Sequence, residues 1–405
     1  MIPSIKAFFR SYKLAVCFLV LELALAFCMV TFCFVFIMQS IERMTLSSGA
    51  DDRHVIWIQY SDGDEDKRSP AQKLAEANTD LRTLASINDV RAVVQAQAVP
   101  LSGSASTARI LPDLSKPEVG IDHVNLYPTT SNVVDAFGLT LIAGRALTQD
   151  DEVDYSIQTP PRGAALVTKS LAERLWHGNP AVGNVIHDGS GSYSATVVGV
   201  VDRAAKSSIG DLASSNDSVF FAVKPGFDYS IYVLRVTAEA NISKIQAQAQ
   251  QKLAALRQDR TLNRIGLLSS SIDDYFQADH QIVKSLFTMI AIMLLISAVS
   301  VGTLVSFCVH SRRRSFGIRR SLGATRGQIV KLILLENLIL AIAATLLGLI
   351  IVLAGEQVTL RYFQLGGLKP LHMFLGACVV LITTLISAIA PALAFVRRNP
   401  MEAMS

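Results

Sequence analysis

Charged side chains are scarce in this chain: Asp, Glu, Lys and Arg together account for only 17% of its 405 residues. Hydrophobic residues make up 51% and the mean hydropathy is +0.39, which excludes an ordinary soluble protein and indicates a membrane protein. The formal net charge of +4 comes largely from residues that flank the apolar stretches, so it gives no indication of nucleic-acid binding.

The motifs of several enzyme classes are also absent. The seven histidines are dispersed, and neither His-Glu-x-x-His nor a paired cysteine spacing occurs, which argues against a zinc enzyme. There is no Gly-x-Ser-x-Gly elbow, and Gly189-Ser190-Gly191 is typical of a hairpin turn rather than of a phosphate loop. No Gly-x-x-x-x-Gly-Lys-Ser/Thr motif supplies the phosphate cradle that ATP hydrolysis needs. We therefore expect no catalytic residue, no metal site and no cofactor bound by this chain.

Four apolar stretches are each long enough to cross a hydrocarbon core of roughly 30 Å as a helix. They comprise residues 14–38, 286–309, 329–353 and 373–395. All five cysteines lie in or at the edge of these stretches: Cys17, Cys28, Cys33, Cys308 and Cys378. The long region between the first two stretches therefore contains no disulfide, even if its compartment is oxidising.

The distribution of Lys and Arg predicts how the four helices are oriented. Basic residues precede the first stretch, lie between the second and third, and follow the fourth: Lys6, Arg10, Lys13, Arg312, Arg313, Arg314, Arg319, Arg320, Arg326, Arg397 and Arg398. The connection 354–372 carries only Arg361 and Lys369. We therefore expect residues 1–13, 310–328 and 396–405 in the cytosol, and residues 39–281 and 354–372 outside it.

Residues 39–281 have mixed polarity and predict an α+β domain of two subdomains outside the membrane. Two strand-helix-strand parts, 54–107 and 222–270, flank an inserted subdomain of strands and turns at 108–221. The expected strands are His54–Tyr60, Val90–Val99, Tyr229–Val236 and Ile265–Leu268, and the expected helices are Ala71–Leu84 and Asn241–Leu256. The predicted fold class is an α-helical membrane protein with four transmembrane helices, in a 1+3 arrangement, plus this domain.

A Ser-x-x-acid pattern at Ser271 to Asp274 predicts the start of a stalk helix, 271–285, that continues into the second apolar stretch. Residues 310–328 predict a short helix, a stop and the start of the next helix. Gly323 stands where a helix that begins near Arg312 needs a left-handed residue at its end, and Thr325 to Gln328 form a capping-box pattern. The short helix has three apolar residues: Phe316, Ile318 and Leu322. Composition alone does not decide whether this surface contacts a protein partner or the lipid interface.

Polar residues inside the predicted spans are costly and need an explanation. For Glu22 in the first span we expect a structural hydrogen bond within the helix bundle, with a substrate or proton path as the alternative. Glu336 and Asn337 in the third span are expected to organise the bundle rather than to catalyse a reaction.

Small residues recur every four positions in two spans, a spacing that lets helices approach closely. They are Ala298, Gly302 and Ser306 in the second span and Ala344 and Gly348 in the third. The pattern leaves open whether they face a helix of the same chain, face another subunit, or arise by chance.

The 310–328 segment also resembles part of a known family. Ser315–Thr325, continued by Gln328–Val330 and Leu334–Asn337, is similar to the coupling-helix signature of the MacB/FtsX-like ABC transporter permeases. Phe137–Leu147 resembles the Gly-Arg motif of the MacB-type periplasmic core domain. Two further stretches agree with it: Ala165 to Gly183 with Val197–Val201 resembles the middle of that domain, and Asn399–Ala403 resembles the family's C-terminal ending.

The resemblance implies a permease subunit that pairs with a second, identical or homologous, permease and couples ATP hydrolysis to motion of its periplasmic domain. MacB itself carries its ATPase domain ahead of the first span, and no such domain is present in this sequence. The expected partners are therefore two copies of a separate ABC ATPase subunit, which binds ATP and Mg. A periplasmic adaptor, a TolC-like outer-membrane channel and membrane lipids are further expected partners, and the expected location is the inner membrane of a Gram-negative bacterium.

In that family the coupling segment sits in a cleft of the ATPase. This role is carried over to seven residues: Phe316, Gly317, Ile318, Arg319, Arg320, Leu322 and Gly323. The apolar side chains are expected to fill the cleft, the arginines to meet acidic residues at its rim, and the glycine at position 323 to form the corner. Two alternatives share the helical plan: a lipoprotein-releasing permease, and an FtsX-like permease that signals to a periplasmic hydrolase or sensor.

Overall fold

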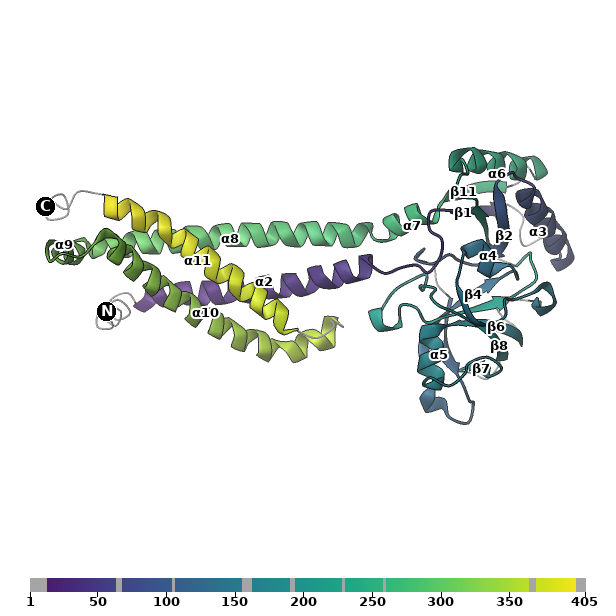
Figure 1. The fold of residues 1–405 in the computed structure, drawn as a ribbon, viewed down its shortest axis with the longest axis horizontal. Coiled ribbons are helices and arrows are strands. Elements are labelled where there is room, and N and C mark those ends of the chain that lie inside the picture. Colours follow the sequence, from purple (N-terminus) through teal and green to yellow (C-terminus); the bar gives the residue numbers. More distant parts are fainter. Residues whose placement is uncertain are drawn as a thin grey trace. The chain divides into compact units, whose positions relative to one another are not determined.

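The computed structural model describes residues 13–62, 68–103, 106–154, 162–189, 194–227, 230–257, 260–363 and 369–397. Within these ranges, the structure describes the backbone but not the side chains of residues 62, 162, 320, 356–363 and 397. The chain separates into two compact units. A helical unit combines Met1–Met44 with Ala278–Ser405, and an α/β unit comprises Thr45–Gln277 (Figure 1).

The two outer parts of the α/β unit form one antiparallel sheet with the strand order β11-β1-β10-β2. The first part is β1 (Val55–Asp62), α3 (Pro70–Ala85) and β2 (Val90–Ala96), and the second is β10 (Ile231–Val236), α6 (Ile242–Leu256) and β11 (Arg260–Leu267). Both parts thus have a strand-helix-strand order, and the strand expected at Ile265–Leu268 already begins at Arg260. Ser69 starts α3 with a capping box to Gln72.

Alternating side chains of this sheet serve two different cores, because successive residues of a strand point to opposite faces. Ile56 and Ile58 of β1 pack with α3 and α6 in one buried cluster. Val55 and Trp57 belong to a second cluster on the other face, together with Phe137 of helix α4. Figure 1 shows α3 and α6 side by side over the sheet.

The middle section contributes seven strands. They are β3 (Ser106–Leu111), β4 (Ile121–Thr129), β5 (Leu141–Gly144), β6 (Arg162–Thr168), β7 (Val185–Asp188), β8 (Ser194–Val201) and β9 (Ser218–Ala222). The pairings β4–β3–β7–β8–β6–β9 end with a parallel pairing of β9 back onto β4, so six of the strands close a ring. The prediction of strands and turns alone was incomplete, since α4 (Val133–Phe137) and α5 (Lys169–Trp176) also lie here. Three 3-10 helices complete the section: Pro117–Val119, Gln149–Asp151 and Leu212–Ser214.

Residues 165–167 of β6 and 219–222 of β9 are buried on both faces, which explains why these stretches are continuously apolar. Val219 and Phe221 pack toward α5, whereas Phe220 packs into the cluster that contains Trp57. The pairing between β2 and β4 is limited to Ala96 with Thr129. The middle section therefore shares a core with the outer parts, and its status as a separate subdomain stays a prediction.

Helix α7 (Leu268–Tyr275) differs from the predicted stalk. It begins at Leu268 rather than at Ser271, and Ser271 accepts a hydrogen bond from Trp57 Nε1 at 2.6 Å. A turn at Phe276 separates α7 from α8 (Gln277–Ser311). The predicted helix start was wrong because α7 already begins at Leu268, and the Ser271 hydroxyl accepts from the indole and donates to the carbonyl oxygen of Leu267 instead of capping a first turn.

Among the residues that the structure describes, four helices of the helical unit are long and apolar enough to cross a membrane: α2 (Lys13–Met44), α8, α10 (Arg326–Phe363) and α11 (Pro370–Arg397). This agrees with the predicted spans. The loop expected at 354–372 was wrong in its first part, since α10 runs to Phe363. Helix α9 (Arg313–Ser321) lies between α8 and α10.

Helices α2, α10 and α11 meet around Phe27, which is fully buried. A Cβ atom added at Gly348 of α10 would lie 2.6 Å from Phe27 Cδ1, and one added at Gly376 of α11 would lie 2.5 Å from Thr31 Oγ1. Ala344, one turn before Gly348, is also fully buried. The small residues of the third span thus allow α2 to pack closely against α10, as their spacing suggests.

The small residues of the second span lie differently. Seven positions of α8 are buried, and three of them, Ser297, Val301 and Val305, each lie one residue before a member of the predicted row. In that row Ala298 and Gly302 are half-buried, and Ser306 is exposed. A Cβ at Gly302 would meet the carbonyl oxygen of Ser387 only at 3.8 Å, an ordinary contact distance. Close helix packing within this chain therefore does not require this row.

Candidate functional site

The backbone of the 310–328 segment has the predicted form. Gly323 has φ of +96°, the left-handed conformation that ends a helix without steric cost. The amide of Thr325 donates to Gln328 Oε1 at 2.9 Å, and the amide of Gln328 donates to Thr325 Oγ1 at 3.3 Å. This capping box starts α10 directly after the corner, so α9 and α10 are joined by a short, well-defined turn.

A bidentate ion pair fastens the beginning of α9 to α10. Arg312 Nη1 donates to Glu336 Oε1 at 3.0 Å, and Arg312 Nη2 donates to Glu336 Oε2 at 2.5 Å. The side chain of Glu336 is 3% exposed and that of Arg312 is 19% exposed. Sequence reasoning expected Glu336 to organise the bundle but did not assign its partner. Asn337 donates to the carbonyl oxygen of Ile333 at 2.8 Å, a bond within its own helix.

Phe316 does not lie where the sequence analysis placed it. It is only 2% exposed, and its ring centroid lies 5.7 Å from that of Phe395 in α11. The guanidinium carbon of Arg312 lies 5.4 Å from the Phe316 ring centroid, a cation–π distance. Phe316 therefore anchors α9 to its own bundle, and the prediction that it fills a partner's cleft is wrong for this conformation.

The other apolar residues of the 310–328 segment, Ile318 in α9 and Leu322 directly after it, point outward. Ile318 is 54% exposed and Leu322 is 83% exposed. Residues four apart share a face of a helix, whereas residues two apart lie nearly opposite each other, so Phe316 and Ile318 must face different ways. Gly317 is buried and Arg319 is half-buried, while the side chain of Arg320 lies outside the description. The segment thus presents an apolar outer face between arginines.

Glu22 in α2 is half-buried, and its Oε1 atom is buried without a hydrogen bond from any described residue. The expected structural hydrogen bond within the bundle is therefore not formed among the residues that the structure describes.

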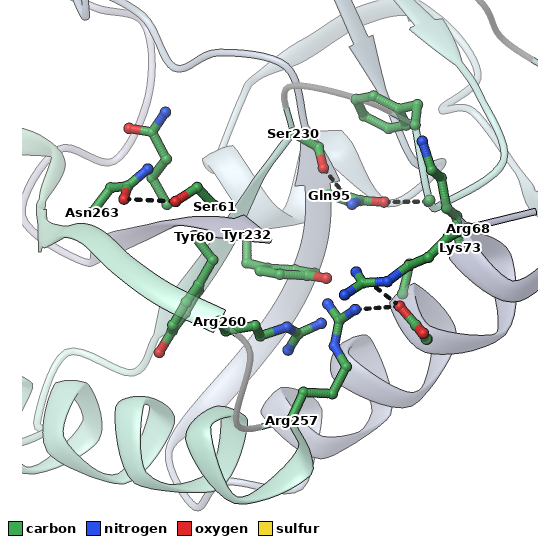
Figure 2. Close-up of a pocket in the computed structure, with 15 residues that line it drawn as sticks. Tyr60, Ser61, Arg68, Lys73, Gln95, Ser230, Tyr232, Arg257, Arg260 and Asn263 are labelled. Carbon is green, nitrogen blue, oxygen red and sulfur yellow. Dashed lines mark hydrogen bonds and ion pairs between the residues drawn. The ribbon is translucent and has the colours of Figure 1, made fainter. Parts of the chain in front are cut away.

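A second cluster of charged side chains surrounds a cavity of about 300 Å³ in the α/β unit, lined by α3, by the residue that follows α6 and by the strands β1, β2, β10 and β11. Figure 2 shows Arg68, Arg257, Arg260 and Tyr232 extending toward the same space. At its floor, Arg260 forms a bidentate ion pair with the buried Asp80 of α3, and Tyr232 Oη donates to Asp80 Oδ2 at 2.6 Å. Burial raises the pKa of Tyr232 well above its usual value, and the charge of Asp80 adds to this effect, so the hydroxyl keeps its proton.

Glu76 occupies the rim of the same cavity. Its carboxylate pairs with both Arg257 and Arg68, the latter at 3.4 Å. Each carboxylate of this cluster therefore pairs with at least one arginine, and these contacts tie α3 to β10, to β11 and to the residue that follows α6. We interpret the cluster as a determinant of the fold, because buried charges are stable only when they are paired.

The Gly-Arg motif forms a compact loop after β5. Gly144 has φ of +75°, and a Cβ there would collide with the carbonyl oxygen of Val198. Arg145 donates to both carboxylate oxygens of Asp151, at 2.6 and 2.9 Å, and Asp151 also accepts from Thr148. The hydrogen bonds from Arg145 hold the pKa of Asp151 at about 2, below its usual value of 3.8. The motif thus has a structural explanation: glycine permits the close approach, and arginine closes the loop.

Among the described residues, no three His, Cys, Asp or Glu side chains are grouped so as to hold a metal ion.

Two family comparisons together extend over most of the chain. The MacB-like periplasmic core domain family matches residues 17–252, and the FtsX-like permease C-terminal family matches residues 287–400. The chain is 22% identical over 376 residues to the uncharacterized ABC transporter permease YknZ of Bacillus subtilis, which covers 90% of this chain and 88% of that protein.

Two further relatives carry the name MacB. The macrolide export ATP-binding/permease protein MacB of Sodalis glossinidius is 25% identical over 197 residues, which covers 44% of this chain and 29% of that protein. The periplasmic region of MacB from Actinobacillus actinomycetemcomitans matches with 16% identity and a TM-score of 0.35, over 58% of this chain and 98% of that structure. The assignment rests on the sequence families, one of which matches more than half of the chain. This chain belongs to the MacB/FtsX-like ABC transporter permeases.

Proposed function

We propose that this permease is the membrane subunit through which a separate ABC ATPase moves a periplasmic domain. Two copies of the ATPase, with ATP and Mg, act on a pair of identical or homologous permeases in the bacterial inner membrane. The movement drives export of a substrate through an adaptor and an outer-membrane channel. The absence of a P-loop motif from the 405 residues supports an ATPase on a different chain.

The division of α9 into two faces carries this proposal. Its inner face is held by Arg312 and Phe316, and its outer face presents Ile318 and Leu322. A helix that served only to connect α8 with α10 would need the inner face alone. The outer apolar face between arginines suits a cleft with an acidic rim, for which Arg319 and Arg320 remain our proposed contacts.

The placement of α9 within the helical unit supports a cytosolic position. Figure 1 shows α9 at the same end of the unit as the start of α2 and the end of α11. Basic residues concentrate at this end, which is the arrangement that the positive-inside rule associates with the cytosol. We therefore propose cytosolic termini and a 1+3 arrangement of spans around a periplasmic domain of two subdomains.

The first experiment replaces the outer face of α9. The variant I318D/L322D should reduce co-purification of the ATPase at least tenfold, because each buried apolar side chain contributes about 1.5–3 kcal/mol and about 1.4 kcal/mol corresponds to a tenfold change. The charge reversal R319E/R320E should have the same effect. Leu114→Asp, which changes an exposed leucine of the α/β unit, is the matched control and should leave co-purification intact.

A loss of ATPase binding reports on docking only if both interface variants keep the thermal stability of the α/β unit. Undiminished recovery of the ATPase by stable I318D/L322D would contradict the proposed interface and favour a helix that lies in the lipid headgroups.

Signalling is the second candidate function, because residues 287–400 match the FtsX-like family. Deletion of the gene should raise cellular accumulation of the transported compound if the protein exports it. A change in the activity of a periplasmic hydrolase or sensor, with no change in accumulation of any tested compound, would favour the signalling role. A lipoprotein-releasing permease predicts retention of lipoproteins in the inner membrane instead.

A further inference from the structure

The ion pair between Arg312 and Glu336 joins parts of the chain that the sequence separates. Arg312 occupies the single position between the end of α8 at Ser311 and the start of α9 at Arg313. Glu336 lies within α10, beyond the corner at Gly323. The two hydrogen bonds of the pair therefore connect the beginning of α9 to the middle part of α10.

The surroundings of the pair bring the last helix into the same contact. The guanidinium of Arg312 lies over the ring of Phe316, and this ring packs against Phe395 of α11. Phe316 also donates its amide hydrogen to the carbonyl oxygen of Arg312 at 3.1 Å, so the arginine and the ring share one helical face. Helices α8, α9, α10 and α11 thus meet at one buried charged group.

Stability alone does not explain an ion pair in this place. A carboxylate that is 3% exposed loses nearly all its hydration, and a well-packed apolar pair is commonly as stable as a buried ion pair. What the pair adds is directional geometry, because a guanidinium and a carboxylate fit in two parallel hydrogen bonds and resist rotation. An ionisable residue within a membrane helix is, for the same reason, a candidate for function.

We propose that Arg312 and Glu336 form the joint that makes α9 and α10 move together, so that displacement of α9 by the ATPase is passed to the membrane helices. Both are positioning residues and do not contact the ATPase. This inference rests on the proposed function of α9. The inference assigns two steps to different residues. Binding of the ATPase depends on Ile318 and Leu322, whereas transmission of the movement to the membrane helices depends on the ion pair between Arg312 and Glu336.

The test uses the full-length permease in lipid nanodiscs with the ATPase that co-purifies with the wild-type chain. Two quantities are measured: the amount of ATPase bound, and the ATP turnover number when the ATPase is saturated with permease. Glu336→Gln should keep ATPase binding within twofold of the wild type and abolish most of the permease-dependent change in turnover. Arg313→Gln, an exposed neighbour on α9, is the control and should change neither quantity.

A second variant separates transmission from folding. R312M/E336L replaces the pair by apolar side chains of similar length, which should preserve thermal stability and ATPase binding while turnover remains uncoupled from the permease. Wild-type coupling in R312M/E336L would overturn the inference, because no ion pair would then be needed. Failure of the wild-type chain to bind any ABC ATPase would instead overturn the proposed function, and this inference with it.

Discussion

Replacement of Asp80 tests the charged cluster of the α/β unit most directly. Asp80→Ala removes the carboxylate from Arg260, whose side chain is 2% exposed, and from the hydroxyl of Tyr232. Breaking a buried ion pair by removing one partner costs about 3–5 kcal/mol, because the remaining charge stays desolvated. For a unit of this size, about 1 kcal/mol shifts the melting temperature by about 2–4 °C, so the expected loss is about 10 °C.

Tryptophan fluorescence provides an assay specific for this unit. The chain has two tryptophans, and both Trp57 and Trp176 lie in the α/β unit. Thermal unfolding of the full chain in detergent, followed by this signal, therefore reports the α/β unit without a contribution from the helical unit. Asp80→Asn should lose less than Asp80→Ala, because the amide oxygen still accepts a hydrogen bond.

Asp122→Ala is the matched control, since Asp122 forms an exposed ion pair with Arg109 at 3.2 Å. Exposed pairs contribute about 0–1 kcal/mol, so the control should shift the melting temperature by no more than about 3 °C. Equal shifts for the two alanine variants would refute the reasoning, because burial would then not determine the strength of the pair.

Three further predictions use the same fluorescence assay or the recovery of folded protein. Asp151 has a lowered pKa of about 2, so its pairing with Arg145 stabilises the fold fully above the usual pKa of 3.8, and the contribution is lost as the pH falls through 2. The wild type should be more stable than D151N by about 1 kcal/mol at pH 6, a value that allows for the solvent exposure of Arg145. This difference in the free energy of unfolding should fall to about half at pH 3. A difference that does not change with pH would count against the ion pair. Gly144→Ala should destabilise the α/β unit by about 1–3 kcal/mol, because φ is positive and the added Cβ meets the carbonyl oxygen of Val198. Gly183→Ala should destabilise it less, because φ is positive there too but no atom lies within 4 Å of the added Cβ. Gly348→Leu should abolish recovery of folded permease from the membrane, because its Cβ meets Phe27 at 2.6 Å, whereas Gly327→Leu, which meets no described atom within 4 Å, should be recovered normally.

Local signals in the sequence predicted the backbone of the 310–328 segment well. The capping box of Thr325 and Gln328 and the left-handed glycine at 323 depend on residues within a few positions of each other, so their chemistry is visible in a single sequence. The same holds for the strand-helix-strand parts, where apolar periodicity gave β1, α3 and α6 close to their observed bounds.

Contacts between distant residues were not accessible in this way. The partner of Glu336 is Arg312, on the other side of a helix and a corner, and several nearby arginines were equally plausible from sequence. The parallel pairing of β9 with β4, which closes the ring of strands, likewise joins segments far apart in the chain. Asp80 gave no signal at all, since an acid in a helix is normally exposed and only the packing of α3 against β10 and β11 buries it.

Helical geometry explains why Phe316 lies on a different face of the segment than the motif suggested. The motif assigned Phe316, Ile318 and Leu322 to one surface. Successive residues of an α-helix turn by about 100°, which places Phe316 about 160° from Ile318 and about 120° from Leu322 around the helix axis. Because Phe316 follows Arg312 by four residues, it shares the face on which Arg312 reaches Glu336, and that face must turn inward to pair the buried charge. The apolar residues that remain outside are then Ile318 and Leu322. The segment therefore hides its aromatic ring and exposes two aliphatic side chains, so it is anchored on one side and exposed on the other.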